Sequence, residues 1–402
     1  MKVCVIGGGQ AGFQVCESLV RKDFQGKLIL VDKDNFLPYQ RPPLSKSYLA
    51  GELEKDRIFL RPKEYYQDNG IELICGQRVE DVNLDAKEAY LSNKTVIDFD
   101  KLVIATGAGL RKIENRNQDV EINYLGSLKE GTYLAEKLLK AKRIIIIGGG
   151  FIGLEIASVC IKRGLEVCVV EKEDRLMKRA VPVDISKFYK KYHEDKGVKI
   201  VTDSSIKKID KLQNAYDLTL NNGQRLQSDL LLAGIGVSPN ISLAEKLGLV
   251  CDNGIKVDES GFASNEDIFA VGDCANFYNV LLKSFIRPES VQHSVDTAKV
   301  VAENILGNLK AYDSVPWFWS DQYDLKLQIA ATSTRFDMTK TVQYTPKSLS
   351  TFCFKNGIHT ATFSVNRPAD IFITKKILAN GSRLTIKHLE NPDFDFKLFA
   401  KK

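Results

Sequence analysis

The stretch KVCVIGGGQAG, residues 2–12, returns as RIIIIGGGFIG at residues 143–153, and this repeat decides the fold. In each copy an apolar run meets three glycines and then passes into a helical pattern. That pattern continues to about Arg21 in the first copy and to about Arg163 in the second. The repeat predicts two units that each consist of a buried strand, a glycine turn and a helix.

Each copy continues into a second apolar run that ends in a carboxylate. Residues 27–31 lead to Asp32, and residues 166–170 lead to Glu171. The glycines permit a tight turn, backbone approach to a pyrophosphate and close packing of helix on strand, while the acid can accept hydrogen bonds from an adenosine ribose. Two such units predict two dinucleotide sites on one chain, which suggests a hydride relay between two cofactors.

Length and composition narrow the class of protein. The chain has 402 residues, with 44% hydrophobic and 27% charged residues, so we expect a globular protein of two or three domains. The apolar stretch 144–161 contains four glycines and Glu155, which argues against a membrane span. The chain opens on the apolar run 3–6 without a basic leader or a cleavage site, so we expect a cytoplasmic protein.

The eight cysteines form no CxxC pair, and most lie in apolar segments, so we expect buried free thiols. The four histidines, at positions 193, 293, 359 and 388, lack metal-ligand spacing, so we expect no metal site.

The net charge of +6 is concentrated near the C-terminus. Residues 316–402 hold 13 Lys and Arg against 7 Asp and Glu, which equals the excess of the whole chain. This segment is either a solvated lysine-rich surface or a face for an acidic partner. No basic stripe is interleaved with aromatic residues, so nucleic acid is not an expected partner.

Two further segments read as strands that end in small-residue turns. LVIATG covers residues 102–107, and IFAVGDCA covers residues 268–275. Asp273 is placed to hydrogen-bond the ribityl hydroxyls of a flavin nucleotide. A helix that starts at Ala275 is expected to face phosphate with its N-terminus.

Together these motifs resemble a known family. In chain order they are GGGQAG (7–12), RPPLSK (41–46), ATG (105–107), GGGFIGLE (148–155), GIGVSPN (234–240), GD (272–273), ESV (289–291) and WFWSDQ (317–322). The chain resembles the FAD-dependent NADH:ferredoxin reductases of the putidaredoxin reductase and biphenyl dioxygenase reductase type, which serve haem monooxygenases and ring-hydroxylating dioxygenases. The glycine motifs alone belong to the wider glutathione reductase-like superfamily.

The resemblance implies an α/β fold with two Rossmann-like dinucleotide-binding domains of the glutathione reductase type. A small α+β domain is expected at the C-terminus. By this resemblance an FAD-binding domain spans residues 1–109 and 236–312, an NAD-binding domain spans residues 110–235, and the C-terminal domain spans residues 313–402.

The resemblance also implies the site and its chemistry. Lys46 and Glu155 are expected as catalytic residues that meet beside flavin N5, with Glu155 in the first turn of its helix. Lys46 stabilises the negative charge of the reduced flavin, and Glu155 holds Lys46. Trp319 covers the flavin edge. The FAD set is Gly7, Gly9, Ala11, Gly12, Asp32, Lys33, Asp34, Arg41, Lys46, Val79, Thr106, Gly107, Asp273, Val291 and Trp319. The NAD set is Gly148, Gly150, Phe151, Ile152, Gly153, Glu171 and Gly236.

NADH then passes a hydride to FAD, and electrons leave singly to an external acceptor. Glu171 favours NADH over NADPH, because a carboxylate repels a ribose phosphate. The implied acceptor is an acidic 2Fe–2S ferredoxin, which suits the basic C-terminal segment. Lys299, Lys375 and Lys376 are candidate docking residues.

The sequence departs from the family pattern at several positions. Gln40 stands where Glu is common, Gly109 where Arg is common, and Gly126 where an Arg normally reaches FAD. The acid of the first repeat is also ambiguous. Spacing from the glycines favours Asp32, whereas the distance back from Arg41 matches the family at Lys33 and Asp34.

The absence of cysteine from residues 36–47 argues against disulfide reductases, coenzyme A disulfide reductases and NADH peroxidases, which need a thiol beside the flavin. Three alternatives stay open. One is a reductase of rubredoxin, quinone or dioxygen. Another is an interaction protein that resembles apoptosis-inducing factor. The third is a chain that has lost FAD affinity through Gly109 and Gly126.

Overall fold

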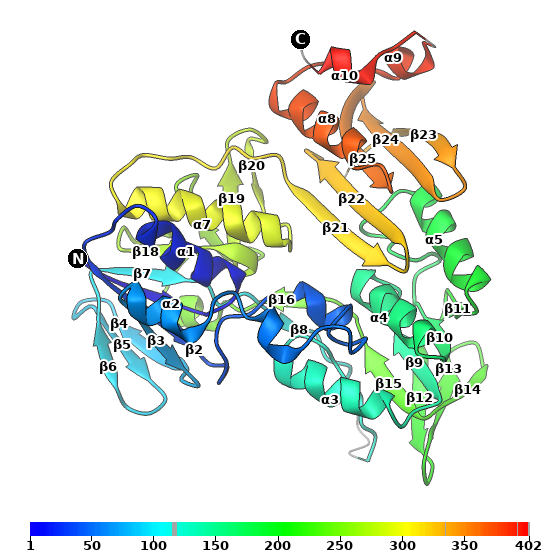
Figure 1. Ribbon diagram of the computed structural model, residues 1–402, viewed down its shortest axis with the longest axis horizontal. Helices are drawn as coiled ribbons and strands as arrows, with labels where there is room; N and C mark the ends of the chain where they lie inside the picture. Colours follow the sequence, from blue (N-terminus) through cyan, green and yellow to red (C-terminus); the bar gives the residue numbers. More distant parts are fainter. Residues whose placement is uncertain (115–118, 334, 392, 401–402) are drawn as a thin grey trace. The chain divides into compact units, whose positions relative to one another are not determined.

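The computed structural model describes residues 1–114, 119–333, 335–391 and 393–400 (Figure 1). The chain divides into two compact units, each assembled from three separate segments. Unit 1 comprises Met1–Gln40, Lys55–Gly109 and Ser238–Phe318, and unit 2 comprises Arg41–Glu54, Leu110–Val237 and Trp319–Lys402. The strands β8 (Ala108–Leu110) and β16 (Val237–Pro239) contain two of the boundaries.

The central sheet of unit 1 contains the first copy of the sequence repeat. It is parallel, with the order β18 (Ile268–Ala270), β7 (Lys101–Ile104), β1 (Lys2–Ile6), β2 (Lys27–Asp32) and β3 (Ile71–Cys75). The strands are apolar runs rather than alternating patterns, as expected where both faces of a parallel sheet are covered. Helix α1 (Gln10–Val20) and helix α7 (Val291–Ile305) pack against each other.

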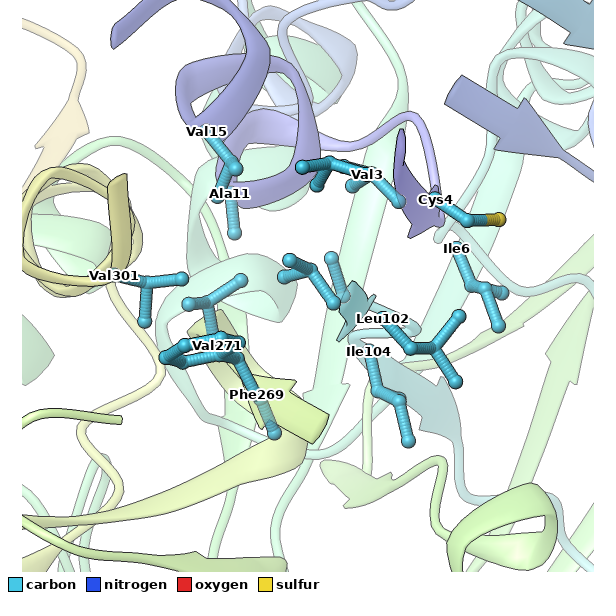
Figure 2. Close-up of a cluster of buried hydrophobic side chains, with 14 of the residues drawn as sticks. Val3, Cys4, Ile6, Ala11, Val15, Leu102, Ile104, Phe269, Val271 and Val301 are labelled. Carbon is cyan, nitrogen blue, oxygen red and sulfur yellow. The ribbon is translucent and has the colours of Figure 1, made fainter. Parts of the chain in front are cut away.

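Figure 2 shows the core that these elements share. Val3 of β1, Leu102 of β7, Phe269 of β18 and Val301 of α7 are each completely buried and belong to one cluster. The core therefore fixes the carboxyl ends of β1, β7 and β18 beside the first turns of α1, which is where the glycine motifs lie.

The remaining elements of unit 1 lie outside this sheet. They include two three-stranded sheets, β4-β5-β6 and β17-β19-β20. The elements are η2 (Lys55–Ile58), α2 (Lys63–Asp68), β4 (Val79–Asn83), β5 (Glu88–Leu91), β6 (Val96–Asp98), α6 (Ser242–Lys246), β17 (Ile255–Val257), η3 (Gly272–Cys274), β19 (Ala275–Asn279) and β20 (Ser284–Ile286).

Unit 2 contains the second copy of the repeat. Its parallel sheet has the order β11 (Lys199–Val201), β10 (Glu166–Val170), β9 (Arg143–Ile147) and β15 (Leu230–Ala233), and α4 (Phe151–Lys162) packs on it. Other elements are η1 (Pro42–Ser45), α3 (Leu128–Leu138), α5 (Val183–Asp195), β12 (Ile206–Lys211), β13 (Tyr216–Leu220) and β14 (Arg225–Ser228).

The C-terminal segment forms a five-stranded sheet in the order β21-β22-β25-β24-β23. Helix α8 packs against β25 and β22, and Figure 1 shows it along this sheet. The bounds are β21 (Trp317–Gln322), β22 (Leu325–Ala331), β23 (Met338–Thr345), β24 (Ser348–Lys355), β25 (Ile358–Val365), α8 (Pro368–Ala379), α9 (Ile386–Glu390) and α10 (Phe396–Phe399).

The α/β class and the repeated strand–turn–helix–strand unit are confirmed. The helix predicted to start at Ala275 is wrong, because residues 275–279 form strand β19, parallel to β17 and antiparallel to β20. Phe277 is completely buried in this strand, and Asn276 and Asn279 are buried beside it. Its side chains therefore suit a sheet, and the helix on this side of the motif is α7.

Within the described part of the chain, no helix has both the length and the apolar character that crossing a membrane requires. No group of three or more His, Cys, Asp or Glu among the same residues could hold a metal ion. The eight cysteines are free, and five are buried. Burial raises the pKa of Cys4, Cys16, Cys160 and Cys353 to about 12, so these thiols are unreactive.

Three buried histidines should make the fold sensitive to acid. Burial lowers the pKa of His193 and His359 to about 4 and that of His293 to about 3. Their stabilising contribution is fully present above pH about 6.5, the pKa in an unfolded chain, and is lost as the pH falls from there through about 4. Each histidine should account for about 2–3 kcal/mol of unfolding free energy between pH 7 and pH 4.

Urea unfolding at pH 7 and at pH 4 measures this loss. A variant with His193, His293 and His359 all replaced by glutamine should have a clearly shallower pH dependence. Equal slopes for the variant and the natural chain would contradict the expectation.

Candidate functional site

The glycine turn of unit 1 is packed too tightly for a side chain. A Cβ on Gly7 would lie 2.3 Å from the Ala105 carbonyl oxygen, and Gly7 has a φ of +112°. A Cβ on Gly12 would lie 1.9 Å from the Gly7 carbonyl oxygen. The N-cap of α1 is Gly9, which has no side chain to satisfy the first N–H groups of the helix. The turn therefore presents bare backbone at a helix N-terminus.

The acids that follow the two β-strands occupy equivalent places. The Gly8 N–H donates to Asp32 Oδ2 at 3.0 Å, and the Gly149 N–H donates to Glu171 Oε2 at 2.7 Å. In both units the carboxylate thus accepts from the middle glycine of the turn. Asp32 is the counterpart of Glu171 within its own unit.

The two other candidates for the acid of unit 1 have different surroundings. Lys33 is exposed, and Asp34 accepts a hydrogen bond from Tyr39 Oη at 2.9 Å. Neither residue makes a hydrogen bond to the glycine turn within the part of the chain that the structure describes.

The ATG segment is held by a residue that the sequence analysis missed. Thr106 Oγ1 donates to the Asn240 carbonyl at 2.8 Å, and Asn240 Nδ2 donates to the Thr106 carbonyl at 2.8 Å. Gly107 has a φ of +66°, and a Cβ there would meet nothing within 4 Å. A Cβ on Gly109 would lie 2.8 Å from Asn240 Oδ1, so this departure from the family pattern makes room for Asn240.

The predicted FAD residues near α1, η3 and α7 come together in unit 1. A Cβ on Gly272 would lie 2.8 Å from Ala11 Cβ and 3.2 Å from Ser294 Oγ. Asp273 follows in η3, and its carbonyl accepts from Arg287 Nη1 at 3.2 Å. Arg287 was not predicted; an arginine two residues before Glu289 was the available signal.

The two predicted valines stand at the first positions of their elements. Val79 opens β4, and Val291 opens α7. Helix α7 is capped by Ser290, whose side chain accepts from the His293 N–H at 3.1 Å.

The second glycine turn, in unit 2, repeats the geometry of the first. A Cβ on Gly148 would lie 2.4 Å from the Gly234 carbonyl oxygen, and a Cβ on Gly153 would lie 2.2 Å from the Gly148 carbonyl oxygen. By contrast, a Cβ on Gly150 would meet nothing within 4 Å. Phe151 and Ile152 form the first turn of α4, and Ile152 is 44% exposed. The N-terminus of α4 therefore faces open space.

Gly236 follows β15 in the same unit. It has a φ of +99°, which favours glycine, and its carbonyl accepts from the Arg111 N–H at 3.0 Å.

Lys46 and Glu155 form an ion pair in which Glu155 is buried and Lys46 is partly buried. Lys46 Nζ lies 2.7 Å from Glu155 Oε2, and their side chains are 21% and 2% exposed. Pro42 and Pro43 begin the short helix η1, which ends at Ser45 and delivers Lys46 to α4. Glu155 is the fifth residue of α4, so its predicted place in the first turn is wrong by one turn. The helix dipole therefore does not explain this acid.

Two serines that were not predicted complete the surroundings of Glu155. Ser45 Oγ donates to Oε2 at 2.5 Å, and Ser320 Oγ of β21 donates to Oε1 at 2.6 Å. The carboxylate thus binds one ammonium and two hydroxyl groups, which fixes its orientation.

The remaining predicted residues lie on several different elements. Arg41 Nη1 donates to the Gly126 carbonyl at 2.5 Å, so Gly126 takes part through its backbone. Trp319 lies in β21 next to Ser320 and is partly buried. Lys375 and Lys376 lie on α8, whereas Lys299 lies on α7 of unit 1.

Two family models match the chain. The model described as pyridine nucleotide-disulphide oxidoreductase matches residues 1–298, and the model described as reductase C-terminal matches residues 317–400. Together they account for both glycine repeats and the five-stranded C-terminal sheet.

Curated relatives match over nearly their full length. Rhodocoxin reductase of Rhodococcus erythropolis is 39% identical, with 99% of this chain and 94% of that protein covered. Putidaredoxin reductase of Pseudomonas putida is 32% identical, with 94% and 92% covered.

Among solved structures, the ferredoxin reductase for the CYP199A2 system of Rhodopseudomonas palustris has a TM-score of 0.95 at 37% identity, with 99% of each chain covered. The covalent putidaredoxin reductase–putidaredoxin complex gives a TM-score of 0.94 at 30% identity, with 100% of this chain and 98% of the other covered. The chain belongs to the pyridine nucleotide-disulphide oxidoreductase family and, through its reductase C-terminal domain, to the ferredoxin reductases within it.

Proposed function

We propose that the chain is an NADH-dependent, FAD-containing reductase that delivers electrons one at a time to an iron–sulfur ferredoxin of an oxygenase system. Its full-length relatives include rhodocoxin reductase and putidaredoxin reductase, and one matched structure is a covalent complex of a reductase with putidaredoxin. The proposal includes the three domains expected from the sequence. Residues 1–109 and 236–312 form the FAD-binding domain, residues 110–235 form the NAD-binding domain, and residues 313–402 form the C-terminal domain.

The residues present fit two dinucleotides. In both units a glycine at the helix N-cap leaves the first N–H groups without a side-chain acceptor, which suits a pyrophosphate. Open space lies where a Cβ on Gly107 or Gly150 would point. The predicted FAD set, with Asp32 favoured over Lys33 and Asp34 by its contact with Gly8, would hold FAD, and the predicted NAD set would hold NADH. FAD when bound supplies the conversion of a two-electron hydride into single electrons.

In this proposal Lys46 and Glu155 carry the electrostatic part of catalysis. The Lys46 ammonium stabilises negative charge that develops during hydride transfer, and Glu155 holds the ammonium in place. Ser45 and Ser320 hold Glu155 in turn. Trp319 and Arg41 are proposed FAD contacts.

The choice of acceptor rests on the amino-acid composition of residues 36–47. This segment delivers Lys46 to Glu155 and contains no cysteine. A thiol–disulfide step therefore has no sulfur to use within this segment, which favours an acceptor outside the chain.

Reduction assays with separate acceptors test the proposal. Purified protein with NADH should reduce a 2Fe–2S ferredoxin at least roughly 100 times faster than a rubredoxin, a quinone, dioxygen or glutathione disulfide, a difference of about 3 kcal/mol in the barrier. Faster reduction of rubredoxin or quinone would overturn the choice of acceptor. A lack of turnover with every acceptor, joined with NADH-induced dimerisation, would favour the interaction protein instead.

Glu171 should determine the preference for NADH. Its carboxylate is held by the N–H groups of Gly149 and Glu173, at 2.7 and 2.9 Å. Glu171→Gln keeps an acceptor and removes the charge that repels a ribose phosphate, so the ratio of kcat/KM for NADH to that for NADPH should fall roughly tenfold. The matched control is Glu173→Gln, which removes a partly exposed charge paired with Lys178 and should leave the ratio unchanged.

Lys375 and Lys376 are proposed docking residues for an acidic ferredoxin. Lys376 Nζ lies 4.7 Å from the ring centroid of Phe372, which is 62% exposed. The double variant Lys375→Glu/Lys376→Glu should raise the KM for ferredoxin roughly tenfold at low ionic strength, because rim charges steer association. The matched control is Lys207→Glu/Lys208→Glu on β12, which should have little effect. Lys299→Glu tests in the same way whether Lys299, which lies on α7 of unit 1, takes part in ferredoxin docking.

The eight free thiols favour a reducing compartment, so we propose the cytoplasm as the location.

A further inference from the structure

A series of buried polar side chains leads from Glu155 to helix α5. Ser320 Oγ donates to Glu155 Oε1 at 2.6 Å, and Gln322 Nε2 donates to Ser320 Oγ at 3.2 Å. His193 Nε2 lies 2.8 Å from Gln322 Oε1, and Tyr323 Oη lies 3.3 Å from His193 Nδ1. Ser320, Gln322 and His193 are each completely buried. We call this series the Glu155–Tyr323 relay.

The donor and acceptor atoms of each side chain fix the direction of every hydrogen bond in the relay. Ser320 has one hydroxyl hydrogen, which it gives to the carboxylate, so its oxygen accepts from the Gln322 amide. The Gln322 carbonyl then accepts, and the hydrogen must come from His193 Nε2. The neutral ring leaves its lone pair on Nδ1, which accepts from the Tyr323 hydroxyl. All four hydrogen bonds therefore point toward Glu155.

His193 decides which end of the Gln322 amide faces Ser320. An amide has donors at one end and an acceptor at the other, and it can reverse by rotation of its last torsion. A donor at His193 Nε2 holds the carbonyl end, which turns the NH₂ group toward Ser320. Without that donor, the amide is free to reverse, and the Ser320 hydroxyl can donate to the amide oxygen instead of the carboxylate.

The surroundings of His193 hold the ring in this neutral form. Burial lowers the pKa of His193 to about 4, so the ring carries one hydrogen at neutral pH.

The turn between β21 and β22 is fixed to helix α5. Tyr192 of this helix donates to Asp324 of the turn, and Lys347 Nζ lies 2.7 Å from Asp324 Oδ2.

The backbone of Tyr323 is an independent observation that supports a role for this side chain. Tyr323 stands in that turn with a φ of +55°. An aromatic residue is uncommon in this left-handed region, where glycine or asparagine would fit without strain. The contact with the histidine ring is a reason for a tyrosine at this strained position.

We propose that His193 is a positioning residue, which through Gln322 and Ser320 fixes the Glu155 carboxylate that holds Lys46. The inference rests on the proposed function only for the use of the Lys46–Glu155 pair in reduction by NADH. The hydrogen-bond directions follow from the chain itself.

The tautomer of His193 can be measured without turnover. Long-range ¹H–¹⁵N spectra of ¹⁵N-histidine-labelled protein at pH 7 should show His193 with hydrogen on Nε2 and an unprotonated Nδ1. Its signal is assigned by its absence from His193→Gln. A ring with hydrogen on Nδ1, or a charged ring, would overturn the proposal. A correct tautomer in a protein that does not reduce ferredoxin would refute the proposed function alone.

Substitutions at His193 test its effect on the ion pair. His193→Leu should slow FAD reduction by NADH in single-turnover experiments roughly tenfold, the size expected for a hydrogen bond to a charged group, while the Kd for NADH stays the same. His193→Gln keeps a donor toward Gln322 and should restore the rate to within about threefold.

His359→Leu is the matched control, because His359 is 3% exposed, also in unit 2, and hydrogen-bonded to Thr362 rather than to the relay. It should lower the Tm about as much as His193→Leu and leave the rate unchanged. Equal rates for His193→Leu and His359→Leu, or no rescue by glutamine, would show that His193 acts only in packing.

Discussion

Gly12→Ala should lose FAD, and Gly153→Ala should lose NADH while keeping FAD. An added Cβ would lie 1.9 Å from the Gly7 carbonyl oxygen in the first case and 2.2 Å from the Gly148 carbonyl oxygen in the second. Both obstacles are backbone atoms, so the helix must move away from the strand that carries the turn. Overpacking of this kind lowers the free energy of unfolding by up to about 3 kcal/mol. The same movement displaces the N–H groups at the helix N-terminus, so we expect roughly 100-fold weaker binding of the nucleotide at that turn.

The two variants are controls for each other, because each alters one copy of the repeat. The FAD content follows from visible absorbance per protein, and NADH affinity from calorimetry. Gly150→Ala is a further control, since its Cβ would meet nothing within 4 Å and its stability to urea should match that of the natural chain. A Gly12→Ala protein with full FAD content would contradict the assignment of the first turn.

The two glycine turns could be predicted from the sequence, because the residues that form each turn lie close together in the chain. Gly7 and Gly148 have φ values of +112° and +106°, and both precede an uncapped helix N-terminus. Asp32 and Glu171 follow from the same local pattern, at the end of the second strand. Residues of a single repeat unit determine where its tight turn, its helix start and the end of its second strand lie.

The side chains that contact Glu155 could not be predicted from a local sequence pattern. Ser45 lies 110 residues away in the sequence and Ser320 lies 165 residues away, so their contacts depend on the tertiary fold. One signal was available in the WFWSDQ string, where Ser320 and Gln322 alternate on a strand and both are buried. Polar residues at a spacing of two on a buried face indicate a hydrogen-bond network.

One short segment with weak local propensity was predicted wrongly. Ala275 suggested a helix start, yet the residues after it are two asparagines, a phenylalanine and a tyrosine, which suit β19 better. The strand conformation of residues 275–279 is decided by their pairing with β17 and β20 rather than by local propensity. The prediction that Gly126 cannot reach FAD stays a prediction; the Gly126 carbonyl accepts from Arg41, and a Cβ there would lie 2.8 Å from Leu110 Cδ1.

Lys46→Met should slow FAD reduction by NADH at least roughly 100-fold without loss of FAD, because a positioned charge at a site of developing charge contributes about that much. The substitution also leaves Glu155 buried at 2% exposure without its ammonium, so the free energy of unfolding should fall by about 3 kcal/mol. A slow rate alone would therefore not distinguish lost catalysis from a disturbed fold.

The double variant Lys46→Met/Glu155→Gln separates these two effects. It removes both charges, and the amide can still accept from one of the two serines that contact Glu155 and donate to the other. Urea unfolding should show that most of the lost stability returns, since a buried pair replaced as a whole is tolerated far better than a single buried charge. Stopped-flow reduction should stay as slow as in Lys46→Met. If the rate returned together with the stability, the ion pair would be structural, and the catalytic charge would have to come from another residue.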